Sequence, residues 1–227
     1  MKTFADRVIA FNRNLDYTGT LPRGIRVMNP FRENPEILPI AEAFYRKYYS
    51  DTRPRRLILG INPGRLGAGA TGIPFTDTKR LAEVCRIPAP DFNTHEPSSV
   101  FVYALIDAFG GPEAFYGRYY INSVCPLGFV RQGANGRWVN YNYYDDTALF
   151  EAVRPFILEN LQKQIDLGVD PSCCYSLGKK NARYLEDLNQ EGRFFRQVVA
   201  LDHPRYIVQY KSKELKSYVG RYLDALL

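Results

Sequence analysis

The chain has 227 residues, which suits one domain with one substantial core, and 45% of the residues are hydrophobic. Charged residues interrupt the apolar runs, so we expect neither a signal peptide at the N-terminus nor a membrane-spanning helix. The formal net charge of +6 is compatible with a nucleic-acid partner, although many cytosolic enzymes are equally basic.

Four short runs of apolar and small residues are predicted to be strands buried on both faces, because they lack a clean alternation of polar and apolar side chains. Apolar residues at helical spacing predict the helices between them. In chain order the predicted elements are helix 36–49, strand 56–62, helix 98–109, strand 119–125, helix 146–165, strand 173–178, helix 179–188, strand 197–201 and helix 211–226.

This alternation predicts the α/β class: a three-layer α/β/α sandwich with a central, four-stranded, mainly parallel sheet. We expect residues 1–227 to form a single domain, with residues 1–50 as an N-terminal helical segment packed on it. Residues 131–138 are predicted to form a hairpin-like excursion, with Asn135-Gly136 as its turn.

Polar residues beside proline or glycine mark three predicted strand ends. Asn62-Pro63-Gly64 follows the first strand, Asn122 and Pro126 lie within and just beyond the second, and Asp202 to Arg205 follow the fourth. Ligands of parallel α/β sheets bind at the carboxyl ends of the strands, so these residues should meet at one edge.

The loop over residues 60–76 contains five glycines and two prolines, more than a structural turn requires. Residues 67–72 match the pattern Gly-x-Gly-x-x-Gly literally. However, five residues separate this match from the strand, and Pro74 disrupts the helix start that a dinucleotide site needs. The loop therefore predicts close approach to a ligand without a dinucleotide cofactor.

Metal and cofactor chemistry are not indicated by the remaining residues. The four cysteines show no Cys-x-x-Cys spacing, and only His95 and His203 could join them in a zinc site. We expect buried, reduced thiols in a cytoplasmic protein, no metal and no cofactor. His95 lies in a proline-rich polar loop and is expected at the surface.

Three motifs resemble the single-strand-selective monofunctional uracil-DNA glycosylases, a family of the uracil-DNA glycosylase superfamily. They are Gly60-Ile61-Asn62-Pro63-Gly64 with 71–75, then 121–127, then Leu201-Asp202-His203-Pro204, in the family's order and with comparable spacing. The match covers roughly residues 55 to 210. The resemblance implies a DNA repair enzyme that flips uracil or a related deaminated base out of DNA and hydrolyses its bond to the sugar.

The resemblance implies a role for each matched residue. Asn62 would orient the attacking water, where other branches of the superfamily place an aspartate as base; an amide cannot take the proton itself. Such orientation can suffice for a strongly dissociative transition state. His203 would stabilise the negative charge that develops on the departing base. Attack by water makes the enzyme monofunctional, without a lysine Schiff base.

The same resemblance implies a base pocket. Phe75 would stack on the extruded base, the amide of Asn122 would read its Watson–Crick edge, and Ile61 and Gly64 would line the site. The alternatives are a core phenylalanine, an amide paired within the sheet, a turn asparagine at position 62 and a histidine that caps a strand end.

The segment after His203 combines rings, apolar side chains and cations, which suits insertion into stacked bases. Better-known family members carry Ser-Pro-Arg-Asn after the His-Pro pair, whereas this chain carries Arg-Tyr-Ile, so it resembles a divergent bacterial branch. An ordinary amphipathic helix start explains the residues from Val208 onward equally well. The predicted DNA contacts are Arg65, Arg205, Tyr206, Gln209, Tyr210 and Lys211.

We expect a monomer acting on single- or double-stranded DNA in the bacterial nucleoid. Two alternatives stay open: an enzyme of the same fold acting mainly on xanthine or hypoxanthine, and a damaged-DNA-binding module without catalysis. A third, an unrelated nucleotide-binding α/β enzyme, would bind nucleotides without affinity for DNA.

Overall fold

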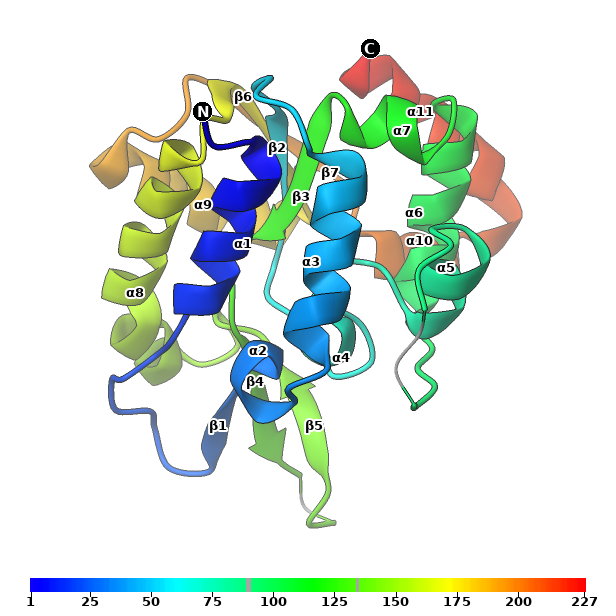
Figure 1. Cartoon of the computed structure of the whole chain (residues 1–227). Coiled ribbons are helices and arrows are strands. Elements are labelled where there is room, and N and C mark those ends of the chain that lie inside the picture. Colours follow the sequence, from blue (N-terminus) through cyan, green and yellow to red (C-terminus); the bar gives the residue numbers. More distant parts are fainter. Residues whose placement is uncertain (89–90, 134) are drawn as a thin grey trace.

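A four-stranded sheet forms the centre of the computed structural model, which describes residues 1–88, 91–133 and 135–227 (Figure 1). The strands lie in the order β3-β2-β6-β7, and every neighbouring pair is parallel. Their bounds are β2 Arg56–Gly60, β3 Tyr119–Ser123, β6 Asp170–Leu177 and β7 Val198–Leu201. All four predicted strands are present, and the predicted parallel sheet is confirmed.

Helices cover both faces of this sheet and complete the three layers. In Figure 1, α8 (Thr147–Asp166) and α9 (Lys179–Gly192) lie on one side, and α6 (Pro97–Ala108) and α11 (Leu215–Leu226) lie on the other. Near the N-terminus, α1 (Phe4–Asn14) packs against α3 (Ile37–Tyr48). The shorter helices are α2 Pro30–Glu33, α4 Ala68–Thr71, α5 Thr78–Glu83, α7 Pro112–Tyr116, α10 Pro204–Tyr210 and the 3-10 turn η1 Ser212–Glu214. Within the described ranges, no helix has the length and apolarity to cross a membrane.

A second, antiparallel sheet lies beyond the carboxyl ends of the central strands (Figure 1). It has the order β1-β4-β5, with bounds β1 Ile25–Met28, β4 Gly128–Gln132 and β5 Trp138–Tyr141. Strands β4 and β5 flank the predicted hairpin, of which position 134 lies outside the described residues. Gly128 brings this sheet against the glycine-rich loop, since an added Cβ would lie 2.3 Å from the Pro63 carbonyl oxygen.

The C-terminal helix begins later than the sequence suggests, at Leu215 rather than residue 211. Residues 204–210 form a separate helix, α10, because Pro204 occupies its first turn and the His203 side chain caps it. At Lys211 the backbone leaves the helical region, with φ −129°, and the chain turns into η1 and α11. The segment after His203 is therefore helical from its start.

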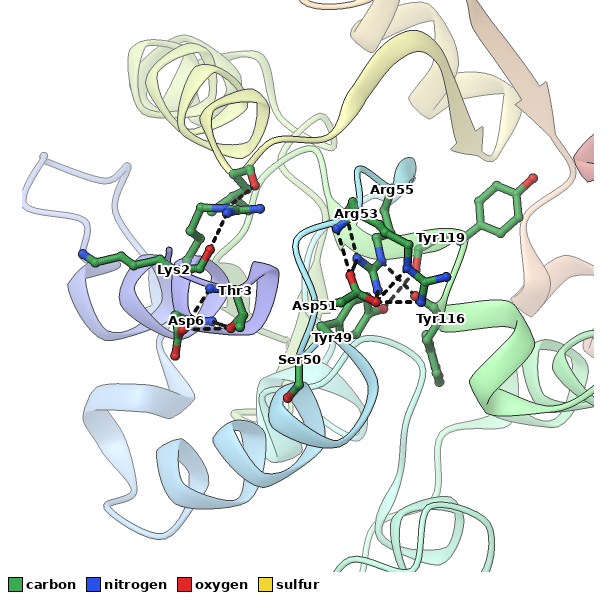
Figure 2. Close-up of polar contacts among 12 residues, drawn as sticks. Lys2, Thr3, Asp6, Tyr49, Ser50, Asp51, Arg53, Arg55, Tyr116 and Tyr119 are labelled. Carbon is green, nitrogen blue, oxygen red and sulfur yellow. Dashed lines mark hydrogen bonds and ion pairs between the residues drawn. The ribbon is translucent and has the colours of Figure 1, made fainter.

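A buried arginine fastens the N-terminal segment to the start of β2 (Figure 2). The guanidinium of Arg55 is fully buried, and it donates hydrogen bonds to Asp51 and to the carbonyl oxygen of Tyr116, the latter at 3.2 Å. The same guanidinium lies 5.3 Å from the ring centroids of both Phe4 and Tyr49. These contacts join α1, the α3–β2 connection and α7 in one cluster.

Candidate active site

A cavity of about 270 Å³ opens at the carboxyl edge of the central sheet, where ligands of parallel α/β folds bind. Five separate stretches of the chain line it: the loop after β2, the start of α6, the end of β3, the end of β5 with the turn after it, and the start of α10. Ile61, Asn62, Gly64, Phe75 and His203, all predicted from the sequence, lie in its wall. The convergence of these distant residues is thus observed for five of the six predicted catalytic and base-pocket residues.

The side-chain amide of Asn62 is held by the segment that follows β5. Its Oδ1 accepts a hydrogen bond from the backbone N–H of Tyr143 at 3.0 Å, and its Nδ2 donates to the carbonyl oxygen of Tyr141 at 3.2 Å. Two backbone groups therefore fix which end of the amide is the acceptor. An amide oxygen has a second lone pair, so Oδ1 keeps one acceptor position for a water molecule.

The ring of Phe75 lies in the cavity wall on a strained backbone. Its φ of 54° is in the left-handed region, which an aromatic residue seldom adopts. Hydrogen bonds hold the flanking chain: the Thr71 hydroxyl donates to the Thr76 carbonyl oxygen at 2.7 Å, and the Thr76 hydroxyl pairs with the Tyr103 hydroxyl at 2.9 Å. Gly60 gives the ring its space, since a Cβ there would lie 3.3 Å from Phe75 Cζ.

Asn122 is the predicted pocket residue that does not line this cavity. It lies on β3 beside Leu59 and faces a separate space of about 20 Å³. Its Nδ2 donates to the Tyr120 hydroxyl at 3.0 Å, and its Oδ1 accepts from the Ser123 N–H at 2.9 Å. The two spaces have Pro63, Ala68 and Pro74 in common, so a thin wall of loop residues separates Asn122 from the main cavity.

His203 presents one ring nitrogen to the protein and keeps the other free. Its Nδ1 accepts a hydrogen bond from the backbone N–H of Arg205 at 3.0 Å, as the N-cap of α10. Burial lowers its pKa to about 4, with a further contribution from the positive charge of Arg205. The ring is therefore neutral at pH 7, and because Nδ1 is an acceptor, Nε2 carries the proton. The ring centroids of Phe75 and His203 are 6.2 Å apart.

The predicted DNA contacts lie on the surface around the opening, and they differ in how close they lie to the cavity. Arg205 lines the cavity itself, and Tyr206 lines an adjoining groove of about 550 Å³ that has Ile61 and His203 in common with the cavity. The side chain of Lys211 forms an ion pair with Glu214 at 3.0 Å. Arg65, Gln209 and Tyr210 are exposed outside both spaces.

Five further residues line the cavity that sequence reasoning did not single out: Glu96, Ser98, Ser123, Asn140 and Asn142. Asn140 accepts a hydrogen bond from the Arg65 N–H at 3.0 Å, so β5 fastens the glycine-rich loop. The adjoining groove also has cations that were not predicted, Lys179, Lys180 and Arg221. The side chain of His95 is 69% exposed, as expected. In the described part of the chain, no group of three or more His, Cys, Asp or Glu could hold a metal ion.

The fold and the cavity define the class: a DNA glycosylase, in which a small cavity at the sheet edge receives a base taken out of the stack. The chain belongs to the uracil DNA glycosylase superfamily, whose family model matches residues 46–227. The crystal structure of wild-type Pedobacter heparinus SMUG2 is similar at 56% sequence identity and a TM-score of 0.96, covering 99% of this chain and 97% of that chain. No curated protein matches the chain.

These comparisons confirm the resemblance to the single-strand-selective monofunctional uracil-DNA glycosylases. The protein is a monofunctional uracil-DNA repair glycosylase that hydrolyses the N-glycosidic bond, and DNA is its partner. The non-catalytic module and the enzyme devoted mainly to other deaminated bases are not favoured by these findings.

Proposed function

We propose that uracil leaves the DNA stack and enters the 270 Å³ cavity, where Asn62 and His203 carry the hydrolysis and Phe75 stacks on the base. The observation that supports this most strongly is that side chains from the β2 end and the β7 end line one cavity. The step is a substitution at the sugar carbon: the water oxygen bonds to that carbon and releases a proton to solvent, the bond to the base nitrogen breaks, and the base departs with the electron pair and is protonated from solvent.

His203 stabilises the departing base. As the glycosidic bond breaks, negative charge spreads onto the pyrimidine carbonyl oxygens. The neutral His203 ring donates its Nε2 proton as a hydrogen bond to one of them, since Nδ1 is occupied by the Arg205 N–H. A donor positioned before the reaction needs no reorganisation when the charge appears.

Asn62 orients the water. Its Oδ1 has one free acceptor position, and the backbone groups of Tyr141 and Tyr143 hold the amide still. An amide cannot accept the proton at neutral pH, so the nucleophile attacks a sugar that already has oxocarbenium character. Fixing the water on the correct face supplies the orientation that such a reaction needs.

Base reading by Asn122 requires a rearrangement on binding. The amide has donor and acceptor groups that match the N–H and carbonyl of uracil, but Tyr120 and Ser123 each occupy one position of the amide at present. We assign Asn122 to base reading through exchange of the Tyr120 hydroxyl for the base edge, with movement of the wall around Pro74.

The DNA strand follows the groove beside the cavity. Lys179, Lys180 and Arg221 lie along this groove and provide cations for phosphates, while Arg205 lies at the cavity itself. The exposed rings of Tyr206 and Tyr210, with centroids 5.6 Å apart, suit contact with unstacked bases. A monomer is sufficient for this arrangement, because one chain supplies every group named.

The compartment that fits this role is the bacterial cytoplasm, with chromosomal DNA as the substrate. All four cysteines are free thiols, as in proteins of a reducing environment. We also propose that the whole chain acts as one domain, because Phe4, Phe44 and Tyr49 belong to the same core as the strands of the sheet.

Labelled oligonucleotides test these roles. Single-stranded and duplex oligonucleotides with one uracil are incubated with excess wild-type protein, Asn62→Ala or His203→Ala, and abasic sites are revealed with alkali. We expect single-turnover rates to fall by about 10²–10³-fold in each variant, with DNA affinity and thermal stability close to wild type. Wild-type rates in both variants would refute the two roles.

A further inference from the structure

Glu96 is an acidic residue in the cavity that the proposed hydrolysis does not use. It lies at the N-cap position of α6, and it lines the cavity together with Phe75, His203 and Arg205. Its Oε2 atom is buried and has no hydrogen-bond partner among the described residues. A buried polar atom without a partner costs free energy, so its retention beside a ligand cavity indicates that a ligand completes its hydrogen bonding.

The backbone of Glu96 is fixed on both sides. Its N–H donates to Oδ2 of the buried Asp77 at 3.1 Å, and its carbonyl oxygen accepts from the Ser99 hydroxyl at 2.7 Å. Asp77 also accepts from Ser99 at 3.0 Å and caps α5. The segment that presents Glu96 to the cavity is therefore anchored to the loop after β2.

Gly67 makes room for the carboxyl group. A Cβ at position 67 would lie 2.3 Å from Oε2 and 2.4 Å from the carboxyl carbon of Glu96. Any other residue at this place in the loop would push the carboxyl away. The glycine-rich loop thus leaves space for the Glu96 carboxyl group and also allows close approach to a nucleobase.

The protonation of Glu96 follows from its surroundings. Burial raises its pKa to about 8, and the negative charge of Asp77 adds to the effect, while Arg205 opposes it. Arg80 and His95 approach the same Oδ2 atom of Asp77 that accepts the Glu96 N–H, and the neutral His203 lines the same cavity as Glu96. At pH 7 the carboxyl is mainly protonated, so it has one O–H donor and one carbonyl acceptor.

We infer that Glu96 is a further substrate-contacting residue, whose carboxyl donates a hydrogen bond to a carbonyl oxygen of the extruded base. This inference rests on the proposed function of the cavity. The protonated carboxyl provides an O–H donor, which a carbonyl oxygen of uracil can accept. The O–H bond strengthens as the carbonyl oxygen gains charge, so it acts on the chemical step.

The sign of the pH effect is fixed by the protonated form. Below about pH 8 the donor is present, and above it the carboxylate can only accept, so the wild-type rate should fall as the pH rises through this range. Glu96→Gln keeps a donor and an acceptor at every pH. Glu96→Ala removes both, and Gly67→Ala leaves the acid but displaces it.

The test is the single-turnover rate on a uracil oligonucleotide between pH 6 and 10 for wild type and the three variants. We expect Glu96→Gln to stay within a few-fold of wild type at pH 7 and to lack the decline above pH 8. Glu96→Ala should lose about 10²-fold at pH 7, and Gly67→Ala a comparable amount. Thermal unfolding of each variant verifies that it is folded.

Three outcomes would overturn the role of Glu96: a wild-type decline retained in Glu96→Gln, a wild-type rate in Glu96→Ala, or equal losses in the Gln and Ala variants. The last would indicate a counter-ion for Arg205, and DNA affinity and its salt dependence would then change instead of the pH profile. A wild-type protein that cleaves no uracil at any pH would refute the proposed function itself, which separates the two failures.

Discussion

The imidazole Nδ1 of His203 accepts the backbone N–H of Arg205 at 3.0 Å, so the residue that begins helix α10 also fixes the tautomer of the ring. One hydrogen bond thereby serves both the helix and the chemistry. If the ring were protonated, Nδ1–H would face the Arg205 N–H and the cap would be lost. Folding of α10 therefore favours the neutral ring.

Acidification should reveal this coupling. The pKa of His203 is lowered to about 4 in the fold, so its contribution to stability is complete above the ordinary value of 6.5 and is lost as the pH falls toward 4. His203→Asn keeps a side-chain cap but has no charge to gain. We expect the Tm of wild type to fall more than that of the variant between pH 7 and pH 4.5. Equal falls, or an NMR titration of His203 near pH 6.5, would contradict this assignment.

The close contact between Gly60 and Phe75 predicts a sensitive position. In Gly60→Ala the new Cβ lies 3.3 Å from Phe75 Cζ and 3.4 Å from Cε2, and the ring must shift in a segment that is already strained. A displacement of up to 1 Å can cost about 10²-fold in rate, so we expect a loss of 10-fold or more in single-turnover cleavage.

Gly220→Ala is the matched control for this substitution. Nothing lies within 4 Å of a Cβ at position 220, which is in the helix α11. Alanine there should leave the cleavage rate unchanged and the stability unchanged or slightly raised. Equal cleavage rates for the two alanine variants would show that the ring tolerates the crowding.

Much of this fold follows from local patterns. Leu57, Ile58 and Leu59 form an uninterrupted apolar run because β2 is one of the two interior strands of the sheet and is covered on both faces. Strands β1 and β5 have four residues each and are largely open to solvent on one side, so no comparable signal marks them. Because the sequence did not predict this second sheet, Asn140 and Asn142, which line the cavity, could not be predicted either.

Only part of the candidate site could be predicted from the sequence, for a similar reason. Asn62 and His203 stand at strand ends, where topology alone gathers polar groups. Glu96 stands in a polar, proline-containing loop that looks solvent-exposed, and its Oε2 atom is buried because Gly67 and Asp77 meet the residue from another segment. Asn122 faces a neighbouring space because its amide finds partners on its own strand. Side-chain pairing of this kind has no signature in residue spacing.

The Arg55 cluster predicts that substitution of Asp51, a residue that looks exposed, causes a large loss of stability. Asp51→Ala would leave a fully buried guanidinium without its counter-ion, which should cost about 3 kcal/mol in urea unfolding. Hydrogen bonds from Arg55 hold the pKa of Asp51 well below its usual range, so the pair's stabilisation is present at neutral pH and is lost as the pH falls.

The Arg13–Glu42 ion pair offers the comparison. Arg13 is 59% exposed, and such surface pairs contribute about 0–1 kcal/mol. Glu42→Ala should therefore shift the urea midpoint far less than Asp51→Ala. A similar shift in both would mean that Arg55 finds another partner or water when Asp51 is removed.

Arg205 should contribute to DNA affinity through phosphate charge. It is exposed at the mouth of the cavity, and Arg205→Ala should weaken binding of a single-stranded oligonucleotide in low salt and reduce the slope of log K against log salt by about 0.7. Fluorescence anisotropy across a salt series measures this slope. Arg13→Ala, on α1 outside the cavity and groove, should leave it unchanged.

Because the cavity wall is assembled from five stretches that lie up to 145 residues apart, between position 60 and position 205, it exists only once the sheet, the hairpin and α10 have all come together. A chain truncated before β7 would retain the glycine-rich loop and still enclose nothing. Base excision can therefore serve as a probe of complete folding: during refolding, the return of cleavage should coincide with the last element to dock.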